Sequence, residues 1–502
     1  MAILMTGLCE KGVDLIWKQC DEEQFAQGLE YLEEAVRAGD PEALFFIGYC
    51  YSWADGGVGF NDKKAYECYK EGIRAGSYRC AIGAVRAGQY DEELQAISQY
   101  TLEESYKKVR EAAEKGDAFA AYQIGSAFEW ENLFEFLPEE ERQQNNCLKW
   151  YEKAAEGGIV PAMVKSGKCY LNGERTEKDI ERGLYYADQA ASRGDAWGLC
   201  RMGLYYQEHD NPEAAFEYFQ AASCQGDKTA ASCLGQMYLT GTGTERDIKK
   251  AVEALETAVS RGDTKCLATL GDIFYRDEVV ERDDERAFYW YNSAYAIGES
   301  RVALPLGHLY RSAGENQDYK KAEKFLREAE QTETDGSASL ILGNMYRDGT
   351  LGTPDVEQAI KFYTAGCEKN NPECMEILGN MYFHGEGVEI DYQKSFDWLN
   401  KALQAGTLQS YSTLAFLYMR GQGCEADEEK AIELFEKATE MECDGDTSYE
   451  LGYLYERRNS SPDDLDRAAE CYQDAIEMGN ESAGRRFAHF KKNLFGKWKV
   501  NY

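Results

Sequence analysis

The stretch LGNMYFHGEGVEIDYQKSFDWLNKALQAG, residues 378–406, has three close copies in the same chain. The copies begin at Leu234, Leu342 and Leu414, so the four starts are spaced by 108, 36 and 36 residues and the period is 36. A repeat of that length with a helix–turn–helix sequence pattern is typical of a solenoid, in which each unit buries its apolar face only against neighbouring units. The period therefore predicts an elongated repeat body, and a surface that holds a partner rather than a pocket that converts a substrate.

One copy shows the structural meaning of the motif. Leu234 and Tyr238 lie four residues apart, so they share one stripe of a first helix. Gly241 and Gly243 follow, and glycine tolerates the positive φ that ends a helix and turns the chain back. Asp247 is placed to cap a second helix, in which alanines seven residues apart permit close helix approach. Each period therefore predicts one helical hairpin, and the whole chain about twelve.

Composition agrees with helices. Of the 502 residues, 43% are apolar and only 8 are proline, while 35 Tyr and 21 Phe are available to fill a core. Few prolines and many Ala, Glu, Leu and Lys suit helix interiors. The sequence therefore predicts an all-α fold.

The charge balance disfavours two classes of partner. The chain carries 55 basic and 90 acidic side chains, a formal net charge of −35. Such a field repels phosphate backbones and anionic lipid headgroups, so neither nucleic acid nor an anionic membrane is expected as a partner. The acidity is explained either by a solvated outer face that maintains solubility or by a basic protein partner.

Targeting and cysteine patterns favour a cytoplasmic protein. The first twenty residues lack the basic start, long apolar run and cleavage pattern of a signal peptide. No window approaches the roughly 20 apolar residues of a membrane span. The sixteen cysteines contain no CxxC, and only Cys367/Cys374 and Cys224/Cys233 lie at comparable places, around junctions between repeats. We expect reduced thiols that pack as small buried side chains.

Motifs that carry chemistry are missing from the sequence. The four histidines lie far apart, and none belongs to HExxH, HxH or a Cys/His cluster with zinc spacing. The glycine pairs lack the Lys-Ser/Thr of a phosphate loop, and no GxSxG nucleophile elbow occurs. We therefore expect no catalytic residue, no metal site and no cofactor, and the chain is predicted not to be an enzyme.

The pattern LGxxYxxGxGxxxDxxKAxxxxxxAxxxG resembles the Sel1-like repeat, a relative of the tetratricopeptide repeat, and the match is strong from about 159 to 479. The resemblance implies a right-handed α–α superhelical solenoid that binds protein. The match is weak from 77 to 158, where ENLFEFLPEEERQQNN (131–146) is either inert loop growth or a partner-specific insertion. The expected parts are N-terminal capping helices at 1–40, divergent repeats with the acidic insertion at 41–158, regular repeats at 159–479, and a basic C-terminal capping helix at 480–502.

The capping helix is expected because a terminal repeat would otherwise expose its inner face. Phe487, Phe490, Leu494 and Trp498 lie three or four residues apart, which predicts one apolar helix face, and Lys and Arg fill the rest of the segment. A membrane-binding or partner-binding amphipathic helix is the alternative.

Candidate binding residues follow from the resemblance, because in tetratricopeptide relatives the first helix of each pair lines the concave face. We define the first-helix stripe as four positions in each repeat: five and two residues before the first Leu, one after the Gly, and one after the Tyr. They share one helix face, and over three consecutive repeats they are net basic. The candidate partner-binding residues are Lys265, Arg301, His308, Arg311, Asn344, Arg347, Asn380 and Phe383.

These side chains suggest how a peptide would be held. Arg311 and Arg347 occupy equivalent positions, roughly 10 Å apart by ordinary helix packing, so a carboxylate could lie between them. Asn344 and Asn380 offer a donor and an acceptor to the backbone of an extended peptide, and apolar side chains follow further along, at Phe416 and Met419. The alternative is that each Arg pairs with an acidic residue of a neighbouring repeat.

The sequence thus predicts a protein–protein interaction scaffold or adaptor that binds a partner peptide or domain on its concave face. An acidic or C-terminal carboxylate group on the partner would suit the basic stripe. The alternatives are an effector or regulator that binds and modulates a cellular enzyme and, more weakly, a hydrolase.

Overall fold

The computed structural model describes residues 6–18, 22–53, 58–130, 146–276, 282–312, 314, 317–407, 410–441, 444–492 and 497–500. Within these residues the chain consists of helical hairpins and one short β-hairpin. Two compact units are formed: Met1–Leu270 with Arg276–Glu281, and Gly271–Tyr275 with Arg282–Tyr502. The predicted all-α class is confirmed.

The first unit contains fifteen described α-helices and a short 3-10 helix, and α16 (Leu267–Tyr275) is divided between the units. The elements before α16 are α1 (Gly7–Trp17), α2 (Glu22–Arg37), α3 (Pro41–Trp53), α4 (Asp62–Arg74), α5 (Tyr78–Arg86), α6 (Glu92–Ile97), α7 (Leu102–Glu114), α8 (Ala118–Trp130), α9 (Asn146–Glu156), α10 (Val160–Asn172), α11 (Ile180–Ala191), α12 (Ala196–Glu208), α13 (Pro212–Cys224), α14 (Lys228–Thr240), α15 (Ile248–Ser260) and η3 (Thr264–Cys266).

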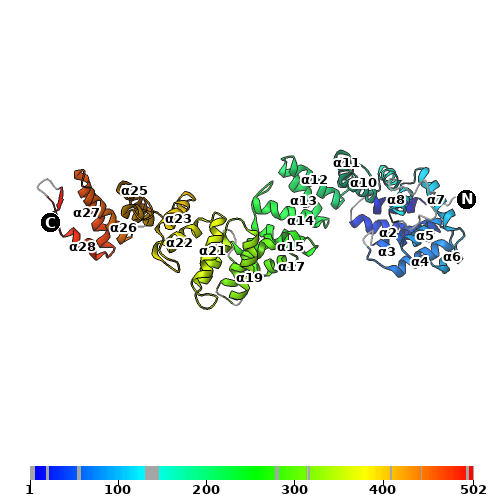
Figure 1. The fold of residues 1–502 in the computed structure, drawn as a ribbon. Coiled ribbons are helices and arrows are strands. Elements are labelled where there is room, and N and C mark those ends of the chain that lie inside the picture. Colours follow the sequence, from blue (N-terminus) through cyan, green and yellow to red (C-terminus); the bar gives the residue numbers. More distant parts are fainter. Residues whose placement is uncertain are drawn as a thin grey trace. The chain divides into compact units, whose positions relative to one another are not determined.

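In the second unit the labelled helices from α21 to α28 follow one another in chain order (Figure 1). Its elements after α16 are α17 (Asp284–Ala296), η4 (Ser300–Val302), α18 (Ala303–Arg311), α19 (Tyr319–Thr332), α20 (Ser337–Arg347), α21 (Val356–Glu368), α22 (Pro372–His384), α23 (Tyr392–Gln404), α24 (Ser410–Arg420), α25 (Glu428–Met441), α26 (Gly445–Arg458), α27 (Pro462–Glu477), α28 (Glu481–Phe487), β1 (Phe490–Lys492) and β2 (Trp498–Val500).

The two glycines of the GxG turn have different tasks. Gly385 ends α22 in the left-handed region, at φ 76°, and its N–H donates to the carbonyl of Met381. Gly387 also has a positive φ, and a Cβ there would lie 2.1 Å from Cγ1 of Val356, at the start of α21 in the preceding repeat. The first glycine therefore closes a helix, and the second permits contact between repeats.

The aspartate of the motif joins the two helices of a hairpin. Asp391 Oδ1 accepts from the backbone N–H of Lys394 at 3.0 Å, and the Asp391 N–H donates to the carbonyl of Tyr382 at 3.0 Å. One residue thus satisfies a donor at the start of the second helix and an acceptor near the end of the first. The predicted cap is confirmed, and the arrangement recurs at Asp179, Asp247, Asp283, Asp355 and Asp427.

The spacing that the repeats share also determines which side chains pack between the two helices of a hairpin. The glycine after the first Leu faces a large side chain from the second helix: a Cβ on Gly343 would lie 2.5 Å from the Tyr363 ring, and one on Gly379 would lie 2.7 Å from Leu399. Tyr363 and Leu399 are both fully buried. At Gly343 and Gly379 the two helices therefore approach too closely for a side chain on the first helix, whereas the α24 repeat has Ala415 at this position.

Around α1, α3 and α8 the aromatic side chains meet in one core. The Trp17 ring centroid lies 4.8 Å from that of Phe119 and 5.5 Å from that of Phe46, and Phe119 lies 5.5 Å from Tyr49. Helices α3 and α8 are therefore in direct contact although α4 to α7 separate them in sequence. Figure 1 shows α2 to α5 and α8 gathered together at the N-terminal end.

The predicted helix over 480–502 is wrong beyond Phe487. Helix α28 ends there, and β1 and β2 form an antiparallel hairpin in which Lys492 pairs with Trp498. The aromatic residues belong to a hairpin core: Phe490 is buried, with its ring centroid 5.5 Å from that of Tyr472 and 6.3 Å from that of Trp498. Leu494 lies outside the described residues. The aromatic residues that lie three or four apart therefore pack onto α27 and do not form one face of a helix.

Other sequence predictions concern individual segments. The insertion at 131–146 lies outside the described residues except for Asn146, the first residue of α9. In the part of the chain that the structure describes, no helix is both long and apolar enough to cross a bilayer. Most described cysteines are buried, and burial raises the pKa of the thiols of Cys68 and Cys233 to about 11. Protonated, buried thiols agree with packing as small apolar side chains.

Candidate partner-binding surface

The structure describes all eight predicted site residues, and it divides them between the two units. Lys265 lies in η3 of the first unit and is exposed. The remaining seven belong to the second unit: Arg301 in η4, His308 and Arg311 in α18, Asn344 and Arg347 in α20, and Asn380 and Phe383 in α22. The second unit therefore contains a continuous series of candidate residues from one repeat to the next.

In the four repeats that supply the candidate residues, every stripe position but one is exposed or half-buried. Arg301, Arg311 and Arg347 are exposed, and the other candidates in the second unit are half-buried. The exception is Ala268, two residues before the first Leu of its repeat, which is fully buried because a methyl group is too short to reach beyond the side chains around it.

Arg301 follows the alternative of internal pairing. Its Nη1 lies 3.6 Å from Oδ2 of Asp272, a stripe residue of the preceding repeat, and its Nε donates to the carboxylate of Glu299. Exposed ion pairs are weak, but two acidic neighbours neutralise this guanidinium. Arg301 is thus the least available of the basic candidates.

Arg311 and Arg347 do not follow that alternative. Among the described residues neither has an acidic partner, and the guanidinium of Arg347 lies 5.9 Å from the ring centroid of Tyr363. Both side chains are exposed at the ends of α18 and α20. These positions are therefore two unneutralised positive charges at equivalent places in consecutive repeats of an acidic chain.

His308 lies beside this pair of charges. Its imidazole is half-buried one turn before Arg311, and burial, together with the guanidinium groups of Arg311 and Arg282, lowers its pKa. The ring is therefore neutral at neutral pH, with one nitrogen as a donor and the other as an acceptor. An anion placed here would favour the protonated form.

The two asparagines are held differently. Asn344 Oδ1 accepts a hydrogen bond from the hydroxyl of Tyr363 at 2.7 Å, across the hairpin of its own repeat. Asn380 Oδ1 accepts one from Thr413 Oγ1 at 3.0 Å, on the first helix of the next repeat. Both side chains thus have their oxygen engaged, so their amide N–H groups are oriented by the fold.

Further along, the last stripe position of α22 and the last two of α24 are apolar, whereas the first two of α22 are acidic, Glu373 and Glu376. The Phe383 ring is half-buried, with its centroid 5.9 Å from that of Tyr392. In the next repeat Phe416 stands edge-on to the buried Phe435, with 5.1 Å between centroids, and Met419 is half-buried beside it. Each of these side chains rests on the core and keeps part of its surface exposed.

A set of tyrosines that the sequence reasoning missed orients other stripe residues. Tyr291 donates to Asp272 Oδ1 and Tyr472 to Glu456 Oε2, each at 2.7 Å, as Tyr363 does to Asn344. Each tyrosine stands twenty residues after the repeat glycine, whereas Leu399 stands at that place in its repeat. The residue type at this position was a signal available in the sequence.

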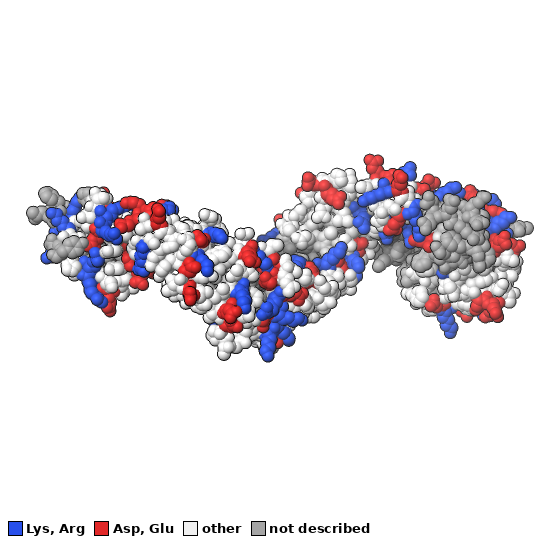
Figure 2. Space-filling view, in the orientation of Figure 1, with Lys and Arg blue, Asp and Glu red and all other residues white. Residues whose placement is uncertain are grey.

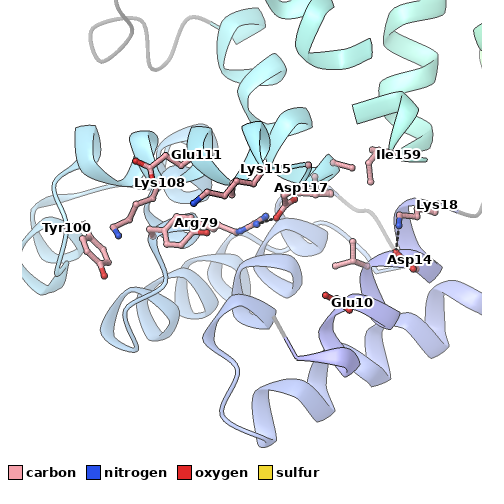
Figure 3. Close-up of a pocket in the computed structure, with 17 residues that line it drawn as sticks. Glu10, Asp14, Lys18, Arg79, Tyr100, Lys108, Glu111, Lys115, Asp117 and Ile159 are labelled. Atoms are coloured by element: carbon pink, nitrogen blue, oxygen red, sulfur yellow. Dashed lines mark hydrogen bonds and ion pairs between the residues drawn. The ribbon is translucent and has the colours of Figure 1, made fainter. Parts of the chain in front are cut away.

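The described part of the first unit also holds a cavity of about 660 Å³, bordered by α1, α5, α7 and α8 (Figure 3). Arg79, only 2% exposed, pairs there with Asp117 and, at 3.1 Å, with Glu42 behind it. Burial raises the pKa of Glu42 to about 7. The charged side chains that line the cavity balance: Lys18, Arg79, Lys108 and Lys115 against Glu10, Asp14, Glu111 and Asp117.

Because those charges balance, the cavity gives little electrostatic preference for an ionic ligand. No sequence signal marked it. Over the face drawn in Figure 2, acidic and basic side chains are interspersed, with Lys and Arg gathered over α19. Among the described residues, no group of three or more His, Cys, Asp or Glu side chains is arranged to hold a metal ion. The first-helix stripe of the second unit is therefore the surface with the most distinct chemistry.

The chain matches the family model described as Sel1 repeat in eleven segments, compared with the twelve or so hairpins expected from the sequence. The matched residues are 41–77, 118–159, 160–195, 198–227, 230–263, 266–299, 301–331, 337–371, 372–407, 410–443 and 446–480. Residues 78–117, which contain α5, α6 and α7, are not matched. This unmatched stretch lies inside the segment 41–158 in which the sequence predicts divergent repeats, and the family model matches residues on both sides of it.

Known proteins are similar over all or part of the chain. Among solved structures, c5321, a protective antigen of uropathogenic Escherichia coli strains with an SLR fold, is 20% identical with a TM-score of 0.60, and the alignment covers 94% of this chain and 99% of that one. A Sel1 repeat protein from Oxalobacter formigenes is 23% identical, with a TM-score of 0.39 over 66% of this chain and 86% of that one.

A curated relative is the ERAD-associated E3 ubiquitin-protein ligase component HRD3B of Arabidopsis thaliana, 31% identical over 110 residues, which are 22% of this chain. The match spans only 18% of the length of that relative. At 20% identity the likeness to c5321 concerns the fold alone. The eleven matched segments cover more than half of the chain, and with the hairpins described above they show that this chain belongs to the Sel1 repeat family.

Proposed function

We propose that this chain is a protein-binding scaffold without catalytic activity of its own, and that the first-helix stripe of the second unit contacts the partner. The observation that carries the proposal is the pair Arg311 and Arg347: exposed, without acidic partners among the described residues, and equivalent in consecutive repeats of a chain with net charge −35. Unneutralised positive charge in that setting favours a partner segment with acidic or C-terminal carboxylate groups.

Rigid helix pairs support such binding. The stripe residues stand on helices held by buried tyrosine and leucine contacts, so ordering the site costs little entropy when the partner binds. Contacts spread over several repeats add to one another within one continuous surface. The concave placement of the stripe, known for tetratricopeptide relatives, is part of the proposal.

The test is recovery of partners from a lysate of the source cells with immobilised full-length chain. Arg311→Glu/Arg347→Glu reverses both charges and should abolish recovery of the partner. Lys320→Glu/Lys361→Glu is the matched control: it changes the net charge equally, in the same two repeats, but on the second helices α19 and α21. Undiminished recovery by the first variant, or equal loss by the control, would contradict the proposal.

A second candidate is regulation of an enzyme by binding. The Arabidopsis relative is named as a component of an E3 ubiquitin-protein ligase, so a partner of this chain could itself be an enzyme. If the captured partner is an enzyme, its rate should change on adding wild-type chain and stay constant on adding Arg311→Glu/Arg347→Glu. If the enzyme binds the wild-type chain and its rate does not change, regulation is contradicted and only the scaffold function remains.

A further inference from the structure

One line of side chains in the second unit is contacted by arginines of the same unit at both ends, while its middle positions are accessible to a partner. These residues follow the Tyr of each first helix, or the Phe in α16, and we call them the post-Tyr line: Tyr275, Arg311, Arg347, Phe383, Met419 and Glu456. They come from six consecutive repeats, α16 to α26.

Arginines from the same unit occupy the two ends. The guanidinium of Arg282, itself ion-paired with Asp284, lies 5.0 Å from the ring centroid of Tyr275. At the other end Glu456 is buried, and it accepts hydrogen bonds from Arg486 of α28 and from Tyr472, both at 2.7 Å. The C-terminal cap therefore closes the line, and neither end offers an unpaired charge to a partner.

The four middle positions divide into two kinds. Arg311 and Arg347 are exposed and have no acidic partner among the described residues, whereas Phe383 and Met419 are half-buried and apolar. The neighbouring line, one residue after each repeat Gly or its Ala equivalent, changes in the same direction: His308, Asn344, Asn380, then Phe416. Two independent lines thus pass from polar to apolar between α20 and α24.

We propose that the partner segment is an extended acidic–apolar peptide, with two acidic residues that lie at α18 and α20 and two large apolar residues that lie at α22 and α24. This inference rests on the proposed function, because it uses the same stripe. Charge complementarity favours acids opposite Arg311 and Arg347, and burial of apolar surface favours large side chains against Phe383 and Met419.

The spacing within the peptide follows from helix packing. Stacked first helices lie roughly 10 Å apart, and an extended chain advances about 3.3 Å per residue. Contacts with successive repeats therefore fall about three residues apart, and the four contacts span about ten residues. The acids and the apolar residues occupy separate ends of the peptide rather than alternating.

Selection from random peptides tests this order without knowledge of the natural partner. A display library of random peptides about twelve residues long, enough to span the four repeats, is selected against the full-length chain and sequenced. The expected result is enrichment of peptides with acids at one end and large apolar residues at the other. Selected peptides should bind Arg311→Glu/Arg347→Glu about tenfold more weakly, or worse, because like charges then face each other.

Phe383→Lys sharpens the test, because the aliphatic stem of lysine can replace part of the ring's packing. Selection against this variant should add a third acidic residue, about three positions beyond the nearer of the other two. Unchanged circular dichroism and thermal midpoint would show that it folds; if it does not, Met419→Lys is used, and the third acid is then expected about six positions beyond the nearer of the other two.

The outcomes separate this inference from the proposed function. Enriched peptides that depend on Arg311 and Arg347 but have alternating or neutral sequences would overturn the acidic–apolar order and leave the binding surface intact. Enrichment that is identical for wild type and Arg311→Glu/Arg347→Glu, or no enrichment at all, would overturn the inference, while loss of the lysate partner with the same variant would still support the proposed function.

Discussion

Helices α3 and α8 of the first unit and helices α18 and α20 of the second contain the same repeat motif, but they differ in the burial of the stripe. The stripe side chains are mostly buried in α3 and α8 and remain accessible to solvent in α18 and α20. In α3 the four stripe positions are Glu42, Phe45, Tyr49 and Ser52, and none is more than 5% exposed. In α18 and η4 the same positions hold Arg301, Leu304, His308 and Arg311, all half-buried or exposed.

The difference shows that the residue type at the stripe decides whether a repeat closes or stays open. Phe45 and Tyr49 meet Phe119 of α8, with 5.9 and 5.5 Å between ring centroids, so large aromatic rings draw two stripes together and form core. Arg311 and Arg347 cannot do this, because burying an unpaired charge is costly. The helices α5 to α7, outside the family match, separate α3 and α8 in sequence while those two pack together.

Removing an aromatic ring from the closed stripe should have the largest effect. Phe119 is 2% exposed and contacts rings of both α1 and α3, so Phe119→Ala should cost about 3–5 kcal/mol of unfolding free energy, the usual range for such cavities. Phe416→Ala, half-buried in the open stripe, should cost less than half as much. Urea unfolding measures both, and equal losses would refute the distinction between closed and open stripes.

The buried charge in the closed region gives a pH test. Burial raises the pKa of Glu42 from its ordinary 4.5 to about 7, so between these pH values the native chain binds a proton that the unfolded chain releases. Its contribution to stability therefore falls as pH rises from about 4.5 to about 7 and is constant above that. Glu42→Gln removes this titration.

Unfolding measured at several pH values should accordingly show a difference, wild type minus Glu42→Gln, that decreases as pH rises across that window. Glu30→Gln, the same substitution at an exposed position on α2, is the control for the loss of a surface carboxylate. A wild-type-minus-Glu42→Gln difference independent of pH would mean that Arg79 holds Glu42 ionised across this window, against the opposing effects of burial and of the Asp117 charge.

In the open region, loss of one tyrosine hydroxyl should have a smaller effect. Tyr363→Phe removes the 2.7 Å hydrogen bond that fixes Asn344, and a hydrogen bond of this kind contributes about 1 kcal/mol. Tyr289→Phe, at an exposed position on α17, should be neutral. Thermal unfolding measures both variants. An equal shift of the two midpoints would contradict a stabilising role for the hydrogen bond between Tyr363 and Asn344.

The smallest effect is expected from His308. Its pKa is lowered by burial and by Arg311 and Arg282, so an anionic peptide that favours the charged ring should bind a few-fold more tightly as pH falls from 7 to about 5.5, where carboxylates remain ionised. Peptide titrations followed by fluorescence anisotropy should show this dependence in wild type and not in His308→Gln. Affinity that weakens equally in both on acidification would exclude His308 from the contact.

Much of the architecture was predictable from local residues. Three features of the repeat act within one hairpin or between adjacent ones: the glycines at 385 and 387, the capping aspartates, and the alanines seven residues apart. Their structural roles can therefore be predicted from a 36-residue window of sequence. The candidate residues were predictable for the same reason, since a stripe is a matter of helix periodicity. Whether Arg301 or Arg311 would find an acidic partner in another repeat was not, because Asp272 approaches Arg301 only when neighbouring repeats stack.

The C-terminal segment shows the same limit. Aromatic residues three and four apart satisfy a helix pattern, but their packing against Tyr472 and against each other favoured a β-hairpin. A period alone cannot tell one helix face from two strands folded on a shared core.

The sequence by itself determined the repeat, the helical hairpins and the positions that form the stripe, because these depend on contacts between residues close together in the chain. Only the tertiary structure decided which stripes are buried, which arginines are neutralised and how the last repeat is covered. Those outcomes depend on contacts between side chains of different helices, such as Phe119 with Phe45 or Arg486 with Glu456. No single repeat contains both partners of such a contact.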